Sequence, residues 1–158
     1  MNTHQYALIL PGLSLLLLTS CSSYNGGIQP LSPPPSTLFM MNNDRPPVKT
    51  DSLQPTLTWK SLGMTESKYD LVIYTGIARG QNALMGQRGY YIPGIEAYYK
   101  EGIDGCSHHV EKPLEPKTVY VWSVRTRNGS SIGQWAKYEV QAIGESWNNL
   151  WWDFRTPN

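Results

Sequence analysis

"LEPKTVYVWSVR" occupies residues 114–125 and contains the strongest alternating pattern in the chain. From residue 120 to residue 127 two series of side chains alternate. One series is mostly apolar and consists of Tyr120, Trp122, Val124 and Thr126; the other is mixed and consists of Val121, Ser123, Arg125 and Arg127. Successive side chains of a strand point to opposite faces, so this period of two predicts a strand with one face turned to a core.

The same alternation occurs in two earlier stretches. In "PTLTWK" (55–60), Leu57 and Trp59 share one face, and in "YDLVIY" (69–74), Tyr69, Leu71 and Ile73 share one face. No stretch keeps helical apolar spacing, and 14 Gly and 12 Pro interrupt the chain throughout. The sequence therefore predicts an all-β fold, with antiparallel sheets packed as a β-sandwich around a shared core.

Together with "FRTP" at 154–157, these stretches resemble fibronectin type III domains over residues 36–158. Leu114, Pro116, Thr118 and Tyr120 match the L-x-P-x-T-x-Y stretch of that family. The resemblance implies an immunoglobulin-like β-sandwich in which the Tyr120 hydroxyl bonds back to the backbone near Leu114. It also implies that Trp59 is a core residue.

Two connections are longer than is usual for this fold, and they leave the strand arrangement in 76–105 and 128–150 open. The first contains "YYIPGI" (90–95) followed by "YYKEGI" (98–103). This echo predicts two short strands joined by a turn, although chance explains so short a repeat nearly as well.

The N-terminus has an apolar block, residues 7–18, that is shorter than the roughly 20 residues of a membrane-spanning helix. Leu18, Thr19, Ser20 and Cys21 follow and resemble the lipobox of bacterial lipoproteins. The resemblance implies a signal peptide over residues 1–20, and acyl chains on Cys21 that hold the protein to the membrane. An ordinary signal peptide with a chance cysteine and an uncleaved hydrophobic anchor are the alternatives. The segment "MNTHQY" departs from the usual signal pattern because it has no Lys or Arg.

The position after the cysteine predicts where the protein resides. Ser22, in place of Asp, resembles the pattern sorted to the outer membrane of Gram-negative bacteria. We therefore expect the protein in the bacterial cell envelope, facing the periplasm or the cell surface. Residues 21–35 are polar and proline-rich, which predicts a tether between the lipid and a sandwich domain over residues 36–158.

Composition narrows the classes of partner. Thirteen Lys and Arg against 12 Asp and Glu give a net charge of +1 without a basic run, which argues against nucleic acid. The second of the two cysteines, Cys106, has no partner in the chain if Cys21 is acylated.

Two motifs suggest catalysis or metal binding, and both are weak. "GSSIG" (129–133) fits G-x-S-x-G, but no His follows Ser131, and "QWAKYEVQA" reads as a strand where that motif needs a helix. "CSHH" (106–109) lacks the ligand spacing of zinc sites, and adjacent His108 and His109 on a strand would face opposite ways. We predict neither an enzyme, nor a metal site, nor a cofactor.

The aromatic content, 10 Tyr and 6 Trp against 2 Phe, favours interfaces because these rings combine contact area with a polar group. Trp151 and Trp152 are adjacent, so we expect Trp152 in the core and Trp151 facing outward. The predicted binding surface consists of Tyr90, Tyr91, Tyr98, Tyr99, Trp147 and Trp151.

Two functions follow, and a covered sheet edge is the structural alternative to both. The first is a lipid-anchored module that binds or assembles envelope proteins. The second is a carbohydrate-binding module for cell-wall or surface polysaccharide.

Overall fold

The computed structural model describes residues 22–25, 28–32, 47–61, 68–79, 90–142 and 145–158. Every regular element in these ranges is a β-strand, and all named strands pair antiparallel. The predicted all-β fold is therefore confirmed for the described residues. The proposed signal peptide, residues 1–20, and Cys21 lie outside them.

The strands form three sheets. The main sheet has the order β11 (Trp152–Arg155), β7 (Val119–Asn128), β4 (Lys68–Arg79) and β5 (Tyr90–Ile103). The short strand β8 (Ser131–Ile132) pairs with β7. The second sheet, β2-β3-β6, consists of Ile28–Ser32, Thr56–Ser61 and Ser107–His109. The third, β1-β9-β10, consists of Ser22–Asn25, Lys137–Ala142 and Glu145–Leu150.

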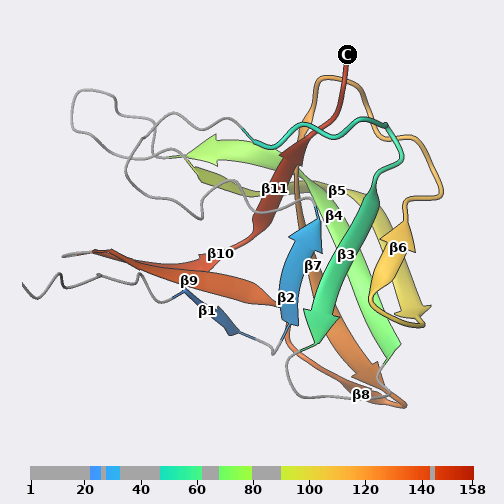
Figure 1. Ribbon diagram of the computed structural model, residues 1–158, viewed down its shortest axis with the longest axis vertical. Coiled ribbons are helices and arrows are strands. Elements are labelled where there is room, and N and C mark those ends of the chain that lie inside the picture. Colours follow the sequence, from blue (N-terminus) through green and yellow to red (C-terminus); the bar gives the residue numbers. More distant parts are fainter. Residues whose placement is uncertain (1–21, 26–27, 33–46, 62–67, 80–89, 143–144) are drawn as a thin grey trace, which may run out of the picture.

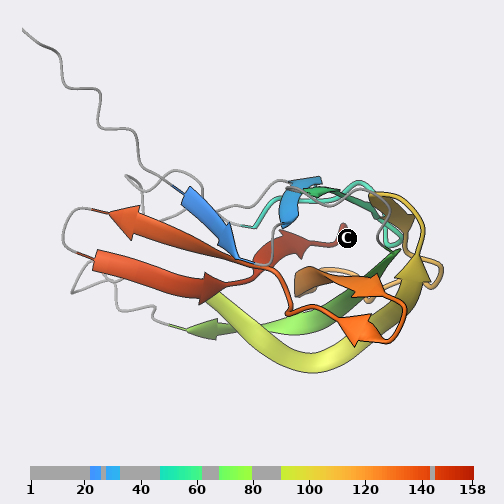
Figure 2. The ribbon, with the colours of Figure 1, turned by 90° about the horizontal axis from the view of Figure 1, so that it is seen from below.

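The main and second sheets face each other as the two layers of a sandwich. Figure 1 shows β2 and β3 in front of β4 and β7, and the turned view in Figure 2 separates the same strands into two layers. Between the layers, the rings of Trp59 and Tyr69 meet edge to face with centroids 5.5 Å apart. All but one of the predicted inward residues are buried: Leu57, Trp59, Tyr69, Leu71, Ile73, Tyr120, Trp122 and Val124. Thr126, at the end of the series, is half-buried.

The corner before β7 has the predicted hydrogen bond. The Glu115 backbone N–H donates to the Tyr120 hydroxyl oxygen at 2.9 Å. The Tyr120 ring is 1% exposed and stacks on Phe154, with centroids 5.6 Å apart. Burial raises the pKa of the Tyr120 hydroxyl, which therefore stays protonated at neutral pH.

The long connection after β7 contains a hairpin inserted into the edge of the main sheet. β8 pairs with the end of β7, and the N–H groups of Gly133 and Ala136 donate to Thr126 and Val124 oxygens at 2.9 and 2.8 Å. The chain then leaves as β9 and β10 and returns as β11, which pairs with the first half of β7. Figure 1 shows this hairpin extending away from the sandwich with β1 beside it.

The prediction of a tether over residues 21–35 is wrong for two segments, which are strands. Ser22–Asn25 pair with β9, and Ile28–Ser32 pair with β3. Ile28 is completely buried, so its side chain joins the core. Pro30 is tolerated because β2 is an edge strand, where a missing N–H leaves no ladder bond unmade.

The predicted pair of short strands in 90–103 is also wrong, because β5 runs unbroken from Tyr90 to Ile103 along β4. The pairing is irregular between Tyr74 and Gly76, opposite residues 93–96, and this irregularity takes the place of the expected turn. Gly94 permits the close approach there, since a Cβ on it would lie 2.7 Å from Thr75 Oγ1.

Candidate binding surface

The outer face of the main sheet, turned away from β3, carries the candidate site. Val72 and Val121 lie on this face by alternation, yet they are 1% and 0% exposed. Their cross-strand partners are Tyr99 and Tyr74 respectively. Aromatic residues therefore flank both valines, and this face differs from the solvated outer face of an ordinary two-layer sandwich.

A buried carboxylate, Asp70 on β4, organises the polar half of this face. The register sets Asp70 directly opposite Arg125 on β7. Arg125 Nε donates to Asp70 Oδ2 at 2.9 Å, and Arg127 donates from Nε to Oδ1 at 2.6 Å and from Nη2 to Oδ2 at 2.8 Å. The backbone N–H of Gly102 adds a bond to Oδ1 at 3.2 Å. The Asp70 side chain is 0% exposed, whereas those of Arg125 and Arg127 are 21% and 23% exposed.

The hydrogen bonds keep this cluster ionised. Burial alone would raise the pKa of Asp70, but the bonds from Arg127, Arg125 and Gly102 outweigh it and hold the pKa below its ordinary value. The bond with Asp70 in turn raises the pKa of Arg127. A buried carboxylate held by two arginines is therefore charged at neutral pH, and both arginines keep an edge facing solvent.

The cluster continues into a row of aromatic rings through Arg125. Its guanidinium carbon lies 4.3 Å from the centre of the Trp135 ring, a cation–π distance. Its Nη2 donates to the Tyr99 hydroxyl at 3.3 Å. Trp135 neighbours Trp151 at 6.5 Å between centroids, and Trp151 meets Tyr74 edge to face at 5.7 Å.

We call this continuous set of residues the outer-face strip. Its members are Tyr74, Trp151, Trp135, Tyr99, Arg125, Asp70, Arg127 and Glu101. Glu101 ends it by accepting a bond from Arg127 Nη2 at 2.9 Å. The strip places partly exposed rings and two planar cations side by side over the outer face of the main sheet. Such a surface suits recognition by contact and hydrogen bonding.

The predicted surface residues fall into four groups. Trp151 is half-buried and Tyr99 is 39% exposed; both belong to the strip, linked through Trp135 and Arg125. Tyr91 lies on the same face of the sheet, nearer the start of β5. Its ring covers Gly76, because a Cβ placed on Gly76 would lie 3.3 Å from the Tyr91 ring.

Tyr98 points the other way and is 8% exposed, so it belongs to the core and not to a surface. The backbones of Tyr90 and Trp147 lie in β5 and β10, but their side chains lie outside the described part of the structure. Trp152 is fully buried beside half-buried Trp151, which confirms that the two neighbours face opposite ways.

Sequence reasoning missed the polar half of the strip. The alternation places Arg125 and Arg127 on the mixed face of their strand, and Asp70 on the face opposite Tyr69 and Leu71, but it assigns none of the three a role. A signal did exist, because charged residues at alternate positions of two strongly apolar strands can share a face if the strands pair. Which strands pair, and in which register, was not available from the sequence.

The two histidines in the described ranges, His108 and His109, have structural partners. Tyr98 hydroxyl and His108 Nε2 are 2.7 Å apart, and burial lowers the pKa of His108, which favours the neutral ring. His109 is exposed, with Nδ1 3.2 Å from Thr56 Oγ1. Cys106 is an exposed free thiol. Within the described ranges, no three His, Cys, Asp or Glu side chains are grouped to hold a metal ion.

Ser131 does not occupy a nucleophile turn. It is exposed and begins β8, a two-residue strand that pairs back on β7. The G-x-S-x-G motif needs a sharp strand-to-helix turn, whereas a further strand, β9, follows here.

No protein-family model, curated protein or solved structure matches this chain. Over the described residues, no helix has the length and apolar character that crossing a membrane requires.

Proposed function

We propose that this chain is a lipid-anchored module of the bacterial cell envelope that binds or assembles other envelope proteins and catalyses no reaction. The outer-face strip carries the proposal. Trp135 and Trp151 are neighbours that are both half-buried, so part of each ring stays open to solvent, and Arg125 sits against Trp135. Aromatic rings and arginine are the side chains most enriched where proteins bind each other, so this face fits a protein partner.

We infer that the domain is fibronectin type III-like. Two observations support this. The sheets β2-β3-β6 and β11-β7-β4-β5 have the strand order A-B-E and G-F-C-C′ when the strands are lettered along the chain. The bond between Glu115 and Tyr120 is the corner that the L-x-P-x-T-x-Y stretch implies. Such folds serve many functions, so the fold by itself names no partner.

The anchor is proposed on Leu18–Cys21, and it has a geometric consequence. Strand β1 begins at Ser22, directly after the cysteine, and pairs with β9. A lipid on Cys21 would therefore hold the hairpin β9–β10 close to the membrane surface, without a long spacer. The expected position of the protein is the outer membrane, facing the periplasm or the cell surface.

Cys21→Ser tests the anchor. We expect the variant to leave the membrane fraction or to accumulate as the unprocessed precursor, because no thiol remains to be acylated. Fractionation and gel migration of the full chain expressed in bacteria measure both. A variant that fractionates and migrates like the wild type contradicts the lipoprotein proposal.

Trp151→Ala tests the binding surface. Crosslinking in intact cells, followed by purification of the full chain, should yield a discrete crosslinked species that Trp151→Ala weakens. Leu31→Ala is the matched control, since Leu31 is 51% exposed on β2 of the opposite layer. Equal yields from both variants would remove the strip from the interface.

Carbohydrate binding is the second candidate, and the Trp135–Trp151 pair favours it. The two rings lie 6.5 Å apart with planes inclined by 37°, a platform on which sugar rings can stack. A glycan array and an envelope protein extract, each probed with the full chain in detergent, separate the two candidates. Trp151-dependent binding to glycans alone would favour the carbohydrate function.

A further inference from the structure

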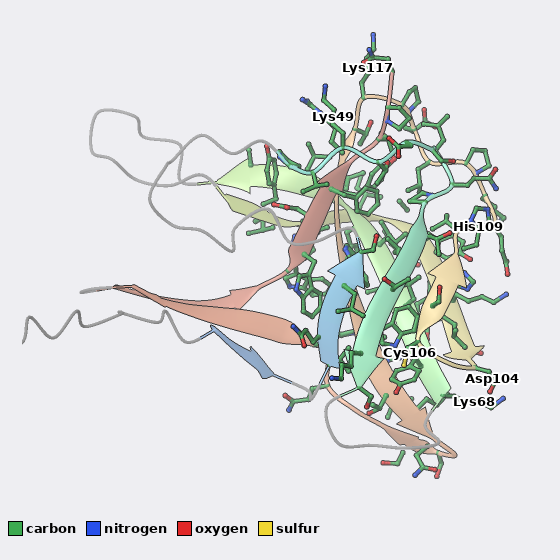
Figure 3. All side chains as sticks on the ribbon, in the orientation of Figure 1. Lys49, Lys68, Asp104, Cys106, His109 and Lys117 are labelled. Atoms are coloured by element: carbon green, nitrogen blue, oxygen red, sulfur yellow. The ribbon has the colours of Figure 1, made fainter. Side chains whose placement is uncertain are left out.

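A basic hollow lies at the end of the domain where the chain terminates, apart from the outer-face strip. Its volume is about 510 Å³, and its charged lining residues are Lys49, Lys117, Arg155 and Asp51. Figure 3 shows Lys49 and Lys117 at the same end of the molecule, next to the carboxy-terminal end of the chain. Sites of 300–1,000 Å³ hold small ligands, so this hollow is large enough for more than an ion.

Three distant segments build the hollow, and backbone bonds fix them together. The N–H of Thr50 donates to the Arg155 oxygen at 2.9 Å, and the N–H of Arg155 donates to the Val48 oxygen at 2.8 Å. The N–H of Lys117 donates to the Pro157 oxygen at 2.8 Å. Below them, the buried Thr156 hydroxyl donates to the Glu115 oxygen at 2.7 Å. The positive side chains therefore stand on a rigid frame.

The charges of the hollow are unbalanced. Three cationic side chains stand against one carboxylate side chain, Asp51, so the lining of the hollow has an excess of positive side-chain charge. Within the described residues, Lys49, Lys117 and Arg155 have no ion-pair partner, unlike Arg125 and Arg127 of the strip. Unpaired cations around a concave surface concentrate positive potential there and attract anions.

The backbone of Lys117 supplies an independent observation. Lys117 has φ = 54°, and it is the only non-glycine residue in the described ranges with positive φ. This left-handed conformation is unfavourable for a side chain with a Cβ, and residues held in it cluster at ligand sites. Here it sets a lysine at the rim of the hollow, in a conformation that glycine would adopt without strain.

We propose that the basic hollow binds the phosphate ester of a small polyol, about the size of one sugar. The excess of positive side chains favours an anionic phosphate, Arg155 supplies a planar fork for two of its oxygens, and the two lysines supply point charges. The phosphate can belong to a sugar phosphate or to a glycerol phosphate headgroup of a lipid or polymer. This site is separate from the anchor and from the strip, so it stands whether or not those proposals hold.

The test titrates the full chain in neutral detergent micelles at low salt with glucose 6-phosphate and with glycerol 3-phosphate, using glucose and glycerol as uncharged references. Calorimetry measures the affinity, and the backbone amide signals of Lys117 and Thr156 report the location. We expect saturable binding of at least one phosphate ester, weakening with salt, with both amide signals shifted. The tighter of the two esters identifies the source of the phosphate.

Matched variants decide the outcome. Lys49→Gln with Lys117→Gln should weaken binding by about tenfold or more, because two charge-assisted contacts are lost. Lys60→Gln with Lys112→Gln removes the same charge from exposed lysines outside the hollow and should leave the affinity unchanged. Equal loss in both double variants, absence of saturable binding, or unshifted Lys117 and Thr156 signals would each overturn the proposal.

Discussion

The inner and outer faces of strands β4 and β7 are held by different physics, although their residues alternate along the same two strands. The inner face packs Leu71 and Trp122 at 0% exposure against the second sheet. The outer face buries a charged Asp70 equally completely, but through hydrogen bonds to Arg125 and Arg127. Apolar burial is non-directional, whereas the ionic cluster depends on each donor and acceptor being in place.

The difference separates the part that maintains the fold from the part suited to recognition. The side chains of the inner face are buried between the sheets, so they are not accessible to a binding partner. The outer-face strip holds its carboxylate internally and leaves the arginine edges and the rings of Trp135 and Trp151 partly open. Variants on the two faces should therefore differ in the size of the stability change and in its dependence on pH.

The largest expected effect is in the core. Trp122→Ala should lower the free energy of unfolding by about 3–5 kcal/mol, because a fully buried indole is replaced by a cavity between the sheets. Urea denaturation of the full chain in detergent measures it. A loss below about 1 kcal/mol would mean that the inner face is not the main source of stability.

The second-largest loss of stability is expected on the outer face. Asp70→Asn should cost about 2–4 kcal/mol, because it leaves two arginines without the charge they surround; their partial exposure keeps the cost below that of a fully buried pair. Asp104→Asn is the control, since its pair with Lys68 is largely exposed and should contribute little. Equal denaturation midpoints for the two variants would show that the Asp70 cluster does not hold the sheet.

The corner should have a smaller effect. Tyr120→Phe should lower the free energy of unfolding by about 1–3 kcal/mol, because the Glu115 N–H loses its acceptor while the ring still packs on Phe154. Chemical denaturation measures the change. An unchanged midpoint would show that this hydrogen bond does not stabilise the corner before β7.

The smallest effect is a pH dependence specific to the outer face. The pKa of Asp70 is lowered in the folded protein, so its contribution to stability is complete above the unfolded value of about 3.9 and is lost as pH falls through the lower folded value. Denaturation midpoints measured downward from pH 5 should therefore fall, and fall less in Asp70→Asn. Parallel curves for the two proteins would contradict the assignment.

The fold of the sandwich was largely predictable from particular residues. Alternation identified Leu57, Trp59 and Trp122 as inward-facing, and all three are buried. The neighbours Trp151 and Trp152 were separated correctly by the same rule. Tyr98 was misassigned to the surface, because the aromatic pair Tyr98 and Tyr99 does not reveal which ring faces inward without the register of β5 on β4.

The candidate site was predictable only in its aromatic members. Trp151 and Tyr99 were expected on a surface, but Trp135 was not expected to join them through Arg125. Asp70 and Arg127 are separated by 57 residues in sequence, so nothing local indicates that they touch.

By itself, the sequence determined the class of fold and the inward faces of β3, β4 and β7, because each depends on the alternation of neighbouring residues. The corner tyrosine was expected from the resemblance of residues 114–120 to a known family. Only the tertiary structure decided that Ile28 belongs to the core and that Asp70 meets two arginines. It also decided that β8 and β11 pair with different halves of β7, with the β9–β10 hairpin between them in the chain. These features depend on pairing between distant segments. Local patterns set which way a side chain points, whereas strand order and register set which side chains it meets.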